Sequence, residues 1–347
     1  MSGRAYLDWN ASAPLRPEAR IAMVEALDVV GNPSSVHAEG RAARALVERA
    51  RARLAEALDA QDADIVFTSG ATEAAALALA GRDLAASGVE HEAVAAWTRD
   101  ALAVGPDGAV AVPDPGASAL QAANGETGVI QALPPGVAVV DATQAFGKIP
   151  FSFARSGASM AIVSAHKIGG PRGVGALVLR HGLAVEARIR GGGQEMGRRS
   201  GTEDVAGIAG FGAAAEAAAR DVAEGAWERV ADLRNVLESL LAEGASDTIC
   251  VGTEAARLPN TACFARPGWT GETQVMRMDL AGYAVSAGSA CSSGKVRASR
   301  VLTAMGLPAE VAGSAIRVSL GPTTTEEEVR GFAEAWLAGS SRRPRAA

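Results

Sequence analysis

The chain has 347 residues and a mass of 35.1 kDa, which exceeds one ordinary hydrophobic core and predicts two domains or one large α/β unit. Hydrophobic residues make up 48% and charged residues 21%, as in a globular protein, and the mean hydropathy is +0.11. The net charge of −6 lacks the basic excess of nucleic-acid-binding proteins, so we expect no nucleic-acid partner. No apolar run reaches membrane-spanning length, so we expect no membrane association.

The first half of the chain predicts helices and short strands in alternation. Helices are expected at residues 16–31 and 40–60, the second with apolar residues at helical spacing. An apolar strand at 63–70 then ends in a glycine turn, and a helix follows at 71–82. Two further apolar runs stop at polar residues: 136–147 and 160–180. Such runs interleaved with helices predict a mainly parallel sheet covered on both faces.

The second half begins with a long helical stretch. Residues 202–242 are helical in character and are broken near Gly225. A smaller pattern follows, with strands expected at 261–266, 283–288 and 315–320, and helices at 271–280, 296–305 and 324–339. In the last of these helices Thr325 and Glu328 form a capping-box pattern.

These elements predict an α/β fold of two domains. A large domain with a mainly parallel sheet between helices is expected at residues 16–245. A small α+β domain is expected to combine residues 1–15 with residues 246–347. The domain boundary is placed where the long helical stretch gives way to the smaller pattern.

The chain has three cysteines, an odd number whose spacing matches no zinc site: Cys250, Cys263 and Cys291. Polar residues follow Met1 directly, without the apolar segment of a signal peptide. We therefore expect a cytoplasmic protein without a metal site, and we interpret Cys250 and Cys263 as packing residues.

Three polar clusters follow apolar strands, where ligands bind in open α/β sheets. "TSGAT", residues 68–72, offers a helix N-terminus and hydroxyls to a phosphate, although a simple helix cap is the commoner role. Asp141 could be an N-cap or could pair with a buried cation. Lys167 could be a solvated loop residue or an imine-forming amine. Together the clusters supply what pyridoxal 5′-phosphate needs: a phosphate cradle, an anion for the ring nitrogen and an amine.

Cys291 lies in "SAGSACSSGK", residues 286–295, among residues that favour turns. A buried structural thiol is the commoner role of a free cysteine. The absence of apolar neighbours leans toward a thiol presented on a loop, without deciding between the two.

The motifs together resemble cysteine desulfurases of the nitrogen-fixation/iron–sulfur-cluster type, in the class V aminotransferase family of fold-type I pyridoxal phosphate enzymes. They occur in family order over nearly the whole chain: "YLDWNASAP", "IVFTSGATE", "NGETGVIQ", "VDATQAFGKIP", "SAHKIGGPRGVGAL", "GGGQEMGRRSGTE" and "SAGSACSSG". The resemblance implies the pyridoxal-phosphate-dependent transferase fold of type I. It also implies conversion of L-cysteine to L-alanine, with a persulfide on Cys291 that passes to an acceptor such as an iron–sulfur scaffold protein.

The resemblance also implies a role for each matching residue. Lys167 would hold the cofactor, Asp141 would pair with its ring nitrogen, Gln144 would bind its phenolic oxygen, and His91 would stack on the ring. The phosphate would be bound by three residues of this chain and by one residue that reaches across a homodimer: Thr72, Ser164, His166 and, from the partner, Thr202. Arg317 would clamp the substrate carboxylate with support from Asn32. Pairing with the nearby acidic helix is the commoner role of an isolated strand arginine.

Two stretches depart from the family. The family's second asparagine of "Asn-Asn-Glu-Thr-Gly" is Gly125 here, so either Asn124 or Gln144 alone is expected to serve the phenolic oxygen. Residues 81–140 are short, and the turn at "LPPG" is expected to replace a crossover helix and leave one sheet face less covered. Two alternatives therefore stay open: a selenocysteine lyase or other class V enzyme, and a non-catalytic scaffold or sulfur-binding partner.

Overall fold

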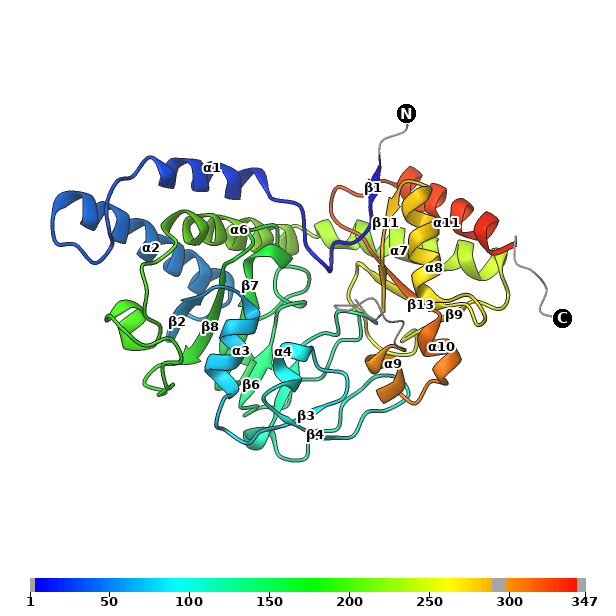
Figure 1. Cartoon of the computed structure of the whole chain (residues 1–347), viewed down its shortest axis with the longest axis horizontal. Coiled ribbons are helices and arrows are strands. Elements are labelled where there is room, and N and C mark those ends of the chain that lie inside the picture. Colours follow the sequence, from blue (N-terminus) through cyan, green and yellow to red (C-terminus); the bar gives the residue numbers. More distant parts are fainter. Residues whose placement is uncertain (1–3, 289–297, 342–347) are drawn as a thin grey trace.

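A computed structural model describes residues 4–288 and 298–341 and shows two groups of elements side by side (Figure 1). One group is built on a five-stranded sheet and the other on a four-stranded sheet. Each sheet has its own clusters of buried apolar side chains.

The first sheet is mainly parallel. Its strands are, in spatial order, β2 Ala63–Thr68, β8 Gly175–Arg180, β7 Met160–Ser164, β6 Val139–Asp141 and β5 Ala119–Gln121. β5, β6 and β7 run parallel, whereas β8 is antiparallel to both of its neighbours. The predicted mainly parallel sheet is confirmed, with one reversed strand that the hydrophobic pattern did not reveal.

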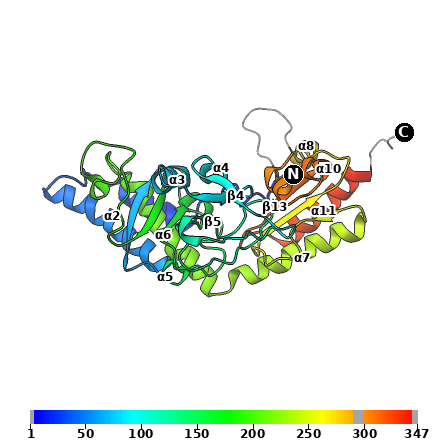
Figure 2. The same cartoon turned by 90° about the horizontal axis from the view of Figure 1, so that it is seen from below.

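Helices cover both faces of this sheet, as predicted. On one side lie α2 Ala38–Ala57 and α6 Val205–Ala223, with α1 Pro17–Leu27 beside them (Figure 1). On the other side lie α3 Ala71–Leu79 and α4 Glu92–Ala95 (Figure 2). Alternate residues of β7 serve the two sides: Ala161 and Val163 join the cluster of α2 and α6, while Ile162 joins that of α3. Four short helical segments complete this group: η1 Pro115–Ala117, α5 Phe153–Ser156, η2 Ala165–Lys167 and η3 Gln194–Gly197.

The short region of the sequence keeps its strands and loses a helix. β3 Ala85–Ser87 pairs in parallel with β4 Arg99–Leu102, and a bridge from Ala85 to Ser118 joins this pair to the edge at β5. The connection from β5 to β6, residues 122–138, is described throughout and contains no helix. A turn at Pro135–Gly136 takes its place, as predicted, and half-buried side chains such as Ile130 and Leu133 pack against the core.

The second group of elements surrounds an antiparallel sheet. Its strands are β12 Ser286–Ala287, β13 Ala315–Ser319, β10 Thr261–Ala265 and β9 Ile249–Cys250. The helices around it are α7 Ala226–Gly244, α8 Gly271–Leu280, α9 Arg300–Ala304, α10 Ala309–Gly313 and α11 Glu326–Ser341. Thr325 and Glu328 form the predicted capping box. Among the described helices, none is long and apolar enough to cross a membrane.

Both ends of the chain build this second group. The N-terminal strand β1, Ala5–Tyr6, pairs with β11, Tyr283–Ala284. The predicted helix break is found at Gly225, whose φ of 74° lies in the left-handed region that favours glycine. α7 buries its apolar face, including Leu237 and Leu241, in the second cluster. α7 therefore packs with the second sheet, and the division near residue 245 stays a prediction.

Candidate active site

A cavity of about 500 Å³ opens where β6, β7 and the start of α3 meet. It brings together seven of the residues predicted from the sequence: Thr72, His91, Asp141, Gln144, Ser164, His166 and Lys167. These residues lie at strand ends far apart in the sequence, so the sheet topology places them in one cavity.

One end of the cavity has the donors that bind a phosphate. Gly70 precedes α3 with a φ of 151°, so the chain turns from β2 straight into the helix. The first backbone N–H groups of α3 face outward from a helix N-terminus, and Thr72 adds a hydroxyl to the cavity lining. Glu73 braces this turn, because it accepts a hydrogen bond from the Ser69 backbone at 2.7 Å and pairs with Arg199 at 2.9 Å.

Asp141 is the last residue of β6. One carboxylate oxygen accepts a hydrogen bond from the Thr143 backbone N–H at 2.9 Å, as a capping aspartate would. Its other oxygen has no hydrogen-bond partner among the described residues, and the side chain lines the cavity. The local turn therefore fixes the carboxylate while one oxygen stays available for a cationic ring nitrogen.

Lys167 is not a solvated loop lysine. Its Nζ donates hydrogen bonds to the backbone carbonyls of Asn10 at 2.7 Å and Ala11 at 3.0 Å. Burial lowers the pKa of Lys167 to about 8, and the positive charge of Arg317 adds to the effect. A substantial fraction of this amine is therefore neutral near physiological pH, as attack on an aldehyde requires.

The two histidines of the cavity differ in burial. Burial, and then the charge of Lys167, lowers the pKa of His166 to about 4, so its ring is neutral near pH 7. His166 Nδ1 lies 3.3 Å from Ser12 Oγ. His91 is exposed at the cavity rim, and its Nδ1 caps α4 by accepting a hydrogen bond from the Ala93 N–H at 3.1 Å.

Gln144 fills the space that Gly125 leaves. A Cβ on Gly125 would lie 3.1 Å from Gln144 Nε2, and Gln144 Nε2 donates to the carbonyl of Asn10 at 3.0 Å. Asn124 is buried and does not line the cavity. Its Oδ1 accepts hydrogen bonds from the backbone of its own loop at Glu126 and Thr127. Of the two residues predicted for the phenolic oxygen, the structure brings only Gln144 to the cavity.

Arg317, on β13, lies behind the Gly125 loop. It does not pair with the acidic start of α11, but with Asp8 at 2.7 Å and with the carbonyl of Gly125 at 3.0 Å. Its Nε is buried and has no hydrogen-bond partner in the described part of the chain. One guanidinium donor therefore has no protein partner among the described residues, and Arg317 itself is not among the residues that line the cavity.

Three predicted residues lie elsewhere. Asn32 and Thr202 are exposed and do not line this chain's own cavity. Cys291 lies outside the described residues. Gly288 is described, and a Cβ added there would lie 2.1 Å from Oε1 of Glu126, beside the Gly125 loop.

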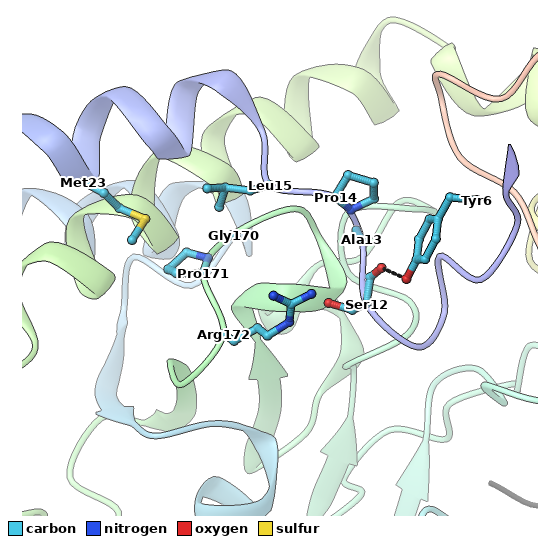
Figure 3. Close-up of a pocket in the computed structure, with 9 residues that line it drawn as sticks. All are labelled: Tyr6, Ser12, Ala13, Pro14, Leu15, Met23, Gly170, Pro171 and Arg172. Carbon is cyan, nitrogen blue, oxygen red and sulfur yellow. Dashed lines mark hydrogen bonds between the residues drawn. The ribbon is translucent and has the colours of Figure 1, made fainter. Parts of the chain in front are cut away.

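A second cavity, of about 460 Å³, adjoins the first and shares Ser12 and Arg172 with it (Figure 3). The Tyr6 hydroxyl donates to the Ser12 carbonyl at 2.7 Å, as the dashed line in Figure 3 shows. Apolar side chains on either side, including Leu15 and Met23, make the rest of its wall.

Glu90, which precedes His91, is a buried carboxyl with one unpaired oxygen. Its Oε1 accepts a hydrogen bond from the Gln121 N–H at 2.9 Å, and its Oε2 has no partner among the described residues. Burial, together with the negative charge of Asp141, raises the pKa of Glu90 to about 8. The carboxyl is therefore mainly protonated at neutral pH.

This burial predicts a pH-dependent free energy of unfolding. Because the pKa of Glu90 is higher in the folded than in the unfolded chain, its contribution is intact below about pH 4.5 and is lost as pH rises through 8. Glu90→Gln, which resembles the protonated acid, should gain stability relative to wild type between pH 6 and pH 9, measured by urea unfolding. The exposed Glu92→Gln is the matched control, and parallel curves for Glu90→Gln and wild type would contradict the prediction.

Sequence reasoning missed the residues that support the cavity from behind. Asn10 contacts Lys167 and Gln144, Lys148 contacts Gln144, and Asp8 pairs with Arg317. All three lie in motifs that carry the family resemblance, "YLDWNASAP" and "VDATQAFGKIP". Their place in these motifs is the sequence feature that could have identified the three residues.

Comparison with known proteins agrees with these features. The family model described as aminotransferase class-V matches residues 5–102 and 113–332, with its gap inside the short region. A cysteine desulfurase from Frankia sp. (strain EuIK1) is 39% identical over 95% of this chain and 89% of its own length. Another, from Cereibacter sphaeroides, is 40% identical over 94% and 93%. The solved structure of a NifS-like protein from Rickettsia africae has a TM-score of 0.88, 31% identity, and coverage of 97% of this chain and 99% of its own.

Proposed function

We propose that this chain, which belongs to the class-V aminotransferase family, is a pyridoxal-phosphate-dependent cysteine desulfurase. The supporting observation is the single cavity in which Lys167, Asp141 and Gln144 face the phosphate-binding end of α3. The cysteine desulfurase relatives match nearly its whole length. The donor set suits the cofactor, since the cavity holds an amine, a carboxylate and neutral phosphate donors.

When bound, the cofactor supplies an aldehyde and a ring that stabilises negative charge on the substrate. Lys167 would hold the aldehyde and would move protons at the substrate carbons, while Asp141 would keep the ring nitrogen protonated. Thr72, Ser164 and His166 hold the phosphate. His91 lies at the rim, where it can stack on the ring.

Arg317 would bind the substrate carboxylate. The thiolate of Cys291 then attacks the sulfur of L-cysteine, so that an S–S bond forms as the C–S bond breaks. The electron pair goes to the substrate carbon, which takes a proton and leaves as alanine. The sulfur stays on Cys291 as a persulfide for an acceptor protein, such as an iron–sulfur scaffold in the cytoplasm.

The test uses purified protein supplied with pyridoxal phosphate. We expect a yellow protein whose colour borohydride abolishes, and sulfide release from L-cysteine in the presence of a reductant. The chain has three lysines, Lys148, Lys167 and Lys295, so peptide mapping after reduction identifies the attachment site among only three candidates. Protein that takes up no cofactor would refute the proposal. Release of selenide from L-selenocysteine without release of sulfide from L-cysteine would favour a selenocysteine lyase.

The proposed enzyme is a homodimer. The outer face of α1 exposes Ile21, Val24 and Leu27, by 58, 56 and 71%. Apolar exposure of this extent on one helix suits an interface between two copies. Thr202 lies outside this chain's own cavity and would serve the partner's.

The interface predicts a monomeric variant. Leu27→Glu should place a charge in the apolar contact and shift the protein to monomers in sedimentation equilibrium, with weaker cofactor retention because Thr202 no longer reaches a partner. Leu280→Glu, on α8 at 88% exposed, is the matched control and should stay dimeric. Equal masses for wild type and Leu27→Glu would count against the interface.

A further inference from the structure

Lys148 is a buried lysine that has no ion pair among the described residues. It is 3% exposed, in the turn after β6. Its Nζ donates to Asn10 Oδ1 at 2.7 Å and to Gln144 Oε1. Burial holds the pKa of Lys148 well below its usual value. Two N–H donors of Lys148 are thus directed at side-chain amide oxygens.

Asn10 ties this lysine to the candidate attachment site. It is fully buried, and its backbone carbonyl accepts from Lys167 Nζ at 2.7 Å and from Gln144 Nε2 at 3.0 Å. Its side-chain amide donates to Thr261 Oγ1 at 2.8 Å and to the Gly125 carbonyl at 3.1 Å. One residue therefore fixes both the amine and the amide that face the cavity.

These contacts allow the Gln144 amide one orientation. Its nitrogen must face the carbonyl of Asn10, which only accepts, and its oxygen then receives a hydrogen bond from Lys148. The reversed amide would set its own oxygen against the carbonyl oxygen of Asn10, so that two acceptors faced each other. The NH₂ group of Gln144 donates one hydrogen to the carbonyl of Asn10, and its second hydrogen stays available at the cavity.

Gly125 provides the space for this arrangement. A Cβ there would lie 3.1 Å from Gln144 Nε2, which is tighter than an ordinary contact. Any larger side chain at this position would displace the amide from Asn10 or would itself occupy the cavity wall.

We propose that Lys148 is a positioning residue, which locks Gln144 with an N–H directed at the cavity so that the cofactor's phenolic oxygen receives a hydrogen bond. The inference rests on the proposed cofactor site. It assigns the hydrogen bond to the phenolic oxygen to Gln144 alone. Lys148 and Asn10 hold the Gln144 amide in place, and Gly125 leaves the space that the amide occupies.

A purely structural role for Lys148 would give a different result. Loss of a fold-stabilising lysine would lower the unfolding temperature and leave the bound cofactor's spectrum unchanged. Loss of a positioning residue would change the spectrum, because an oxygen that loses a donor binds a proton more tightly and its titration moves to higher pH.

The experiment titrates the visible absorbance of the cofactor-loaded protein between pH 6 and pH 10. Lys148→Met should raise the midpoint by about one pH unit, the value of one ordinary hydrogen bond. In a Gln144→Leu background the same change should add nothing, because the residue through which Lys148 acts is gone. Gln144→Glu keeps an oxygen for Lys148 but removes the NH₂ group, so it should also raise the midpoint.

Two results would overturn the inference. One is a folded Lys148→Met protein with the wild-type midpoint, and the other is an equal shift with and without Gln144. Should Lys148→Met fail to fold, Lys148→Gln serves the same comparison, because its shorter amide cannot reach both oxygens. Failure of the wild type to take up cofactor would refute the proposed function and is distinct from either result.

Discussion

Replacing Cys291 with serine is expected to leave cofactor binding intact and to lower sulfide release from L-cysteine by at least about a hundredfold. The reaction needs a thiolate that attacks sulfur, and a serine hydroxyl is neither ionised near pH 7 nor able to hold a persulfide. Cofactor absorbance, its change on addition of L-cysteine, and sulfide release measure the three properties separately. Normal turnover by Cys291→Ser would show that another thiol carries the sulfur.

The chain supplies two matched controls for this experiment. Burial raises the pKa of the Cys250 thiol to about 11 and that of Cys263 well above its usual value. Neither thiol ionises near neutral pH, and Cys263 lies in a buried cluster under β10. Cys250→Ser and Cys263→Ala should therefore keep wild-type sulfide release per folded molecule, although Cys263→Ala should lower stability by about 1 kcal/mol.

The second large effect is expected at Lys167. Lys167→Met should remove the amine that holds the aldehyde, so that the cofactor is lost on gel filtration and turnover falls by at least about a thousandfold. With a pKa of about 8, roughly a quarter of the native amine is neutral at pH 7.5, against about one in a thousand for an ordinary lysine. Capture of added cofactor by the cofactor-free protein should accordingly accelerate as pH rises through 8.

Lys167→Arg is the control for charge at this position. It keeps a cation beside Asn10 and Asp141 but cannot form an imine, so it should fail in the same way as Lys167→Met. Because the chain has only three lysines, borohydride reduction of either variant can attach the cofactor only to Lys148 or Lys295. A reduced cofactor found on Lys148 would refute Lys167 as the attachment site.

The sequence predicted the parts of the fold that depend on local pattern. Apolar runs and helical spacing located β2, α3, α6, α7 and α11, and Gly225 marked the helix break. The reversed direction of β8 was not predictable, since an apolar run is the same in either direction. α10, a helix of five residues, is too short to show a periodic pattern.

The residues of the candidate site also fall into those that a local sequence pattern predicts and those that it does not. Thr72 and Lys167 each follow a strand and Asp141 ends one, so their meeting in one cavity follows from the topology of the sheet. Asn10 acts through contacts with Lys148 and Lys167, more than a hundred positions away, which no local pattern encodes. Asn124 was expected in the site because of its motif, but its side chain is committed to the turn of its own loop.

The position of Asn10 in the chain constrains when this site can be completed during synthesis. The amide of Asn10 is held by Thr261, and its backbone N–H by Ser319, so its carbonyl reaches its place beneath Lys167 only once the last third of the chain is present. The strands of the five-stranded sheet all lie within residues 63–180, although Leu258 from the last third of the chain joins its buried cluster. Stable cofactor capture is therefore expected late in synthesis, once Thr261 and Ser319 can hold Asn10 in place.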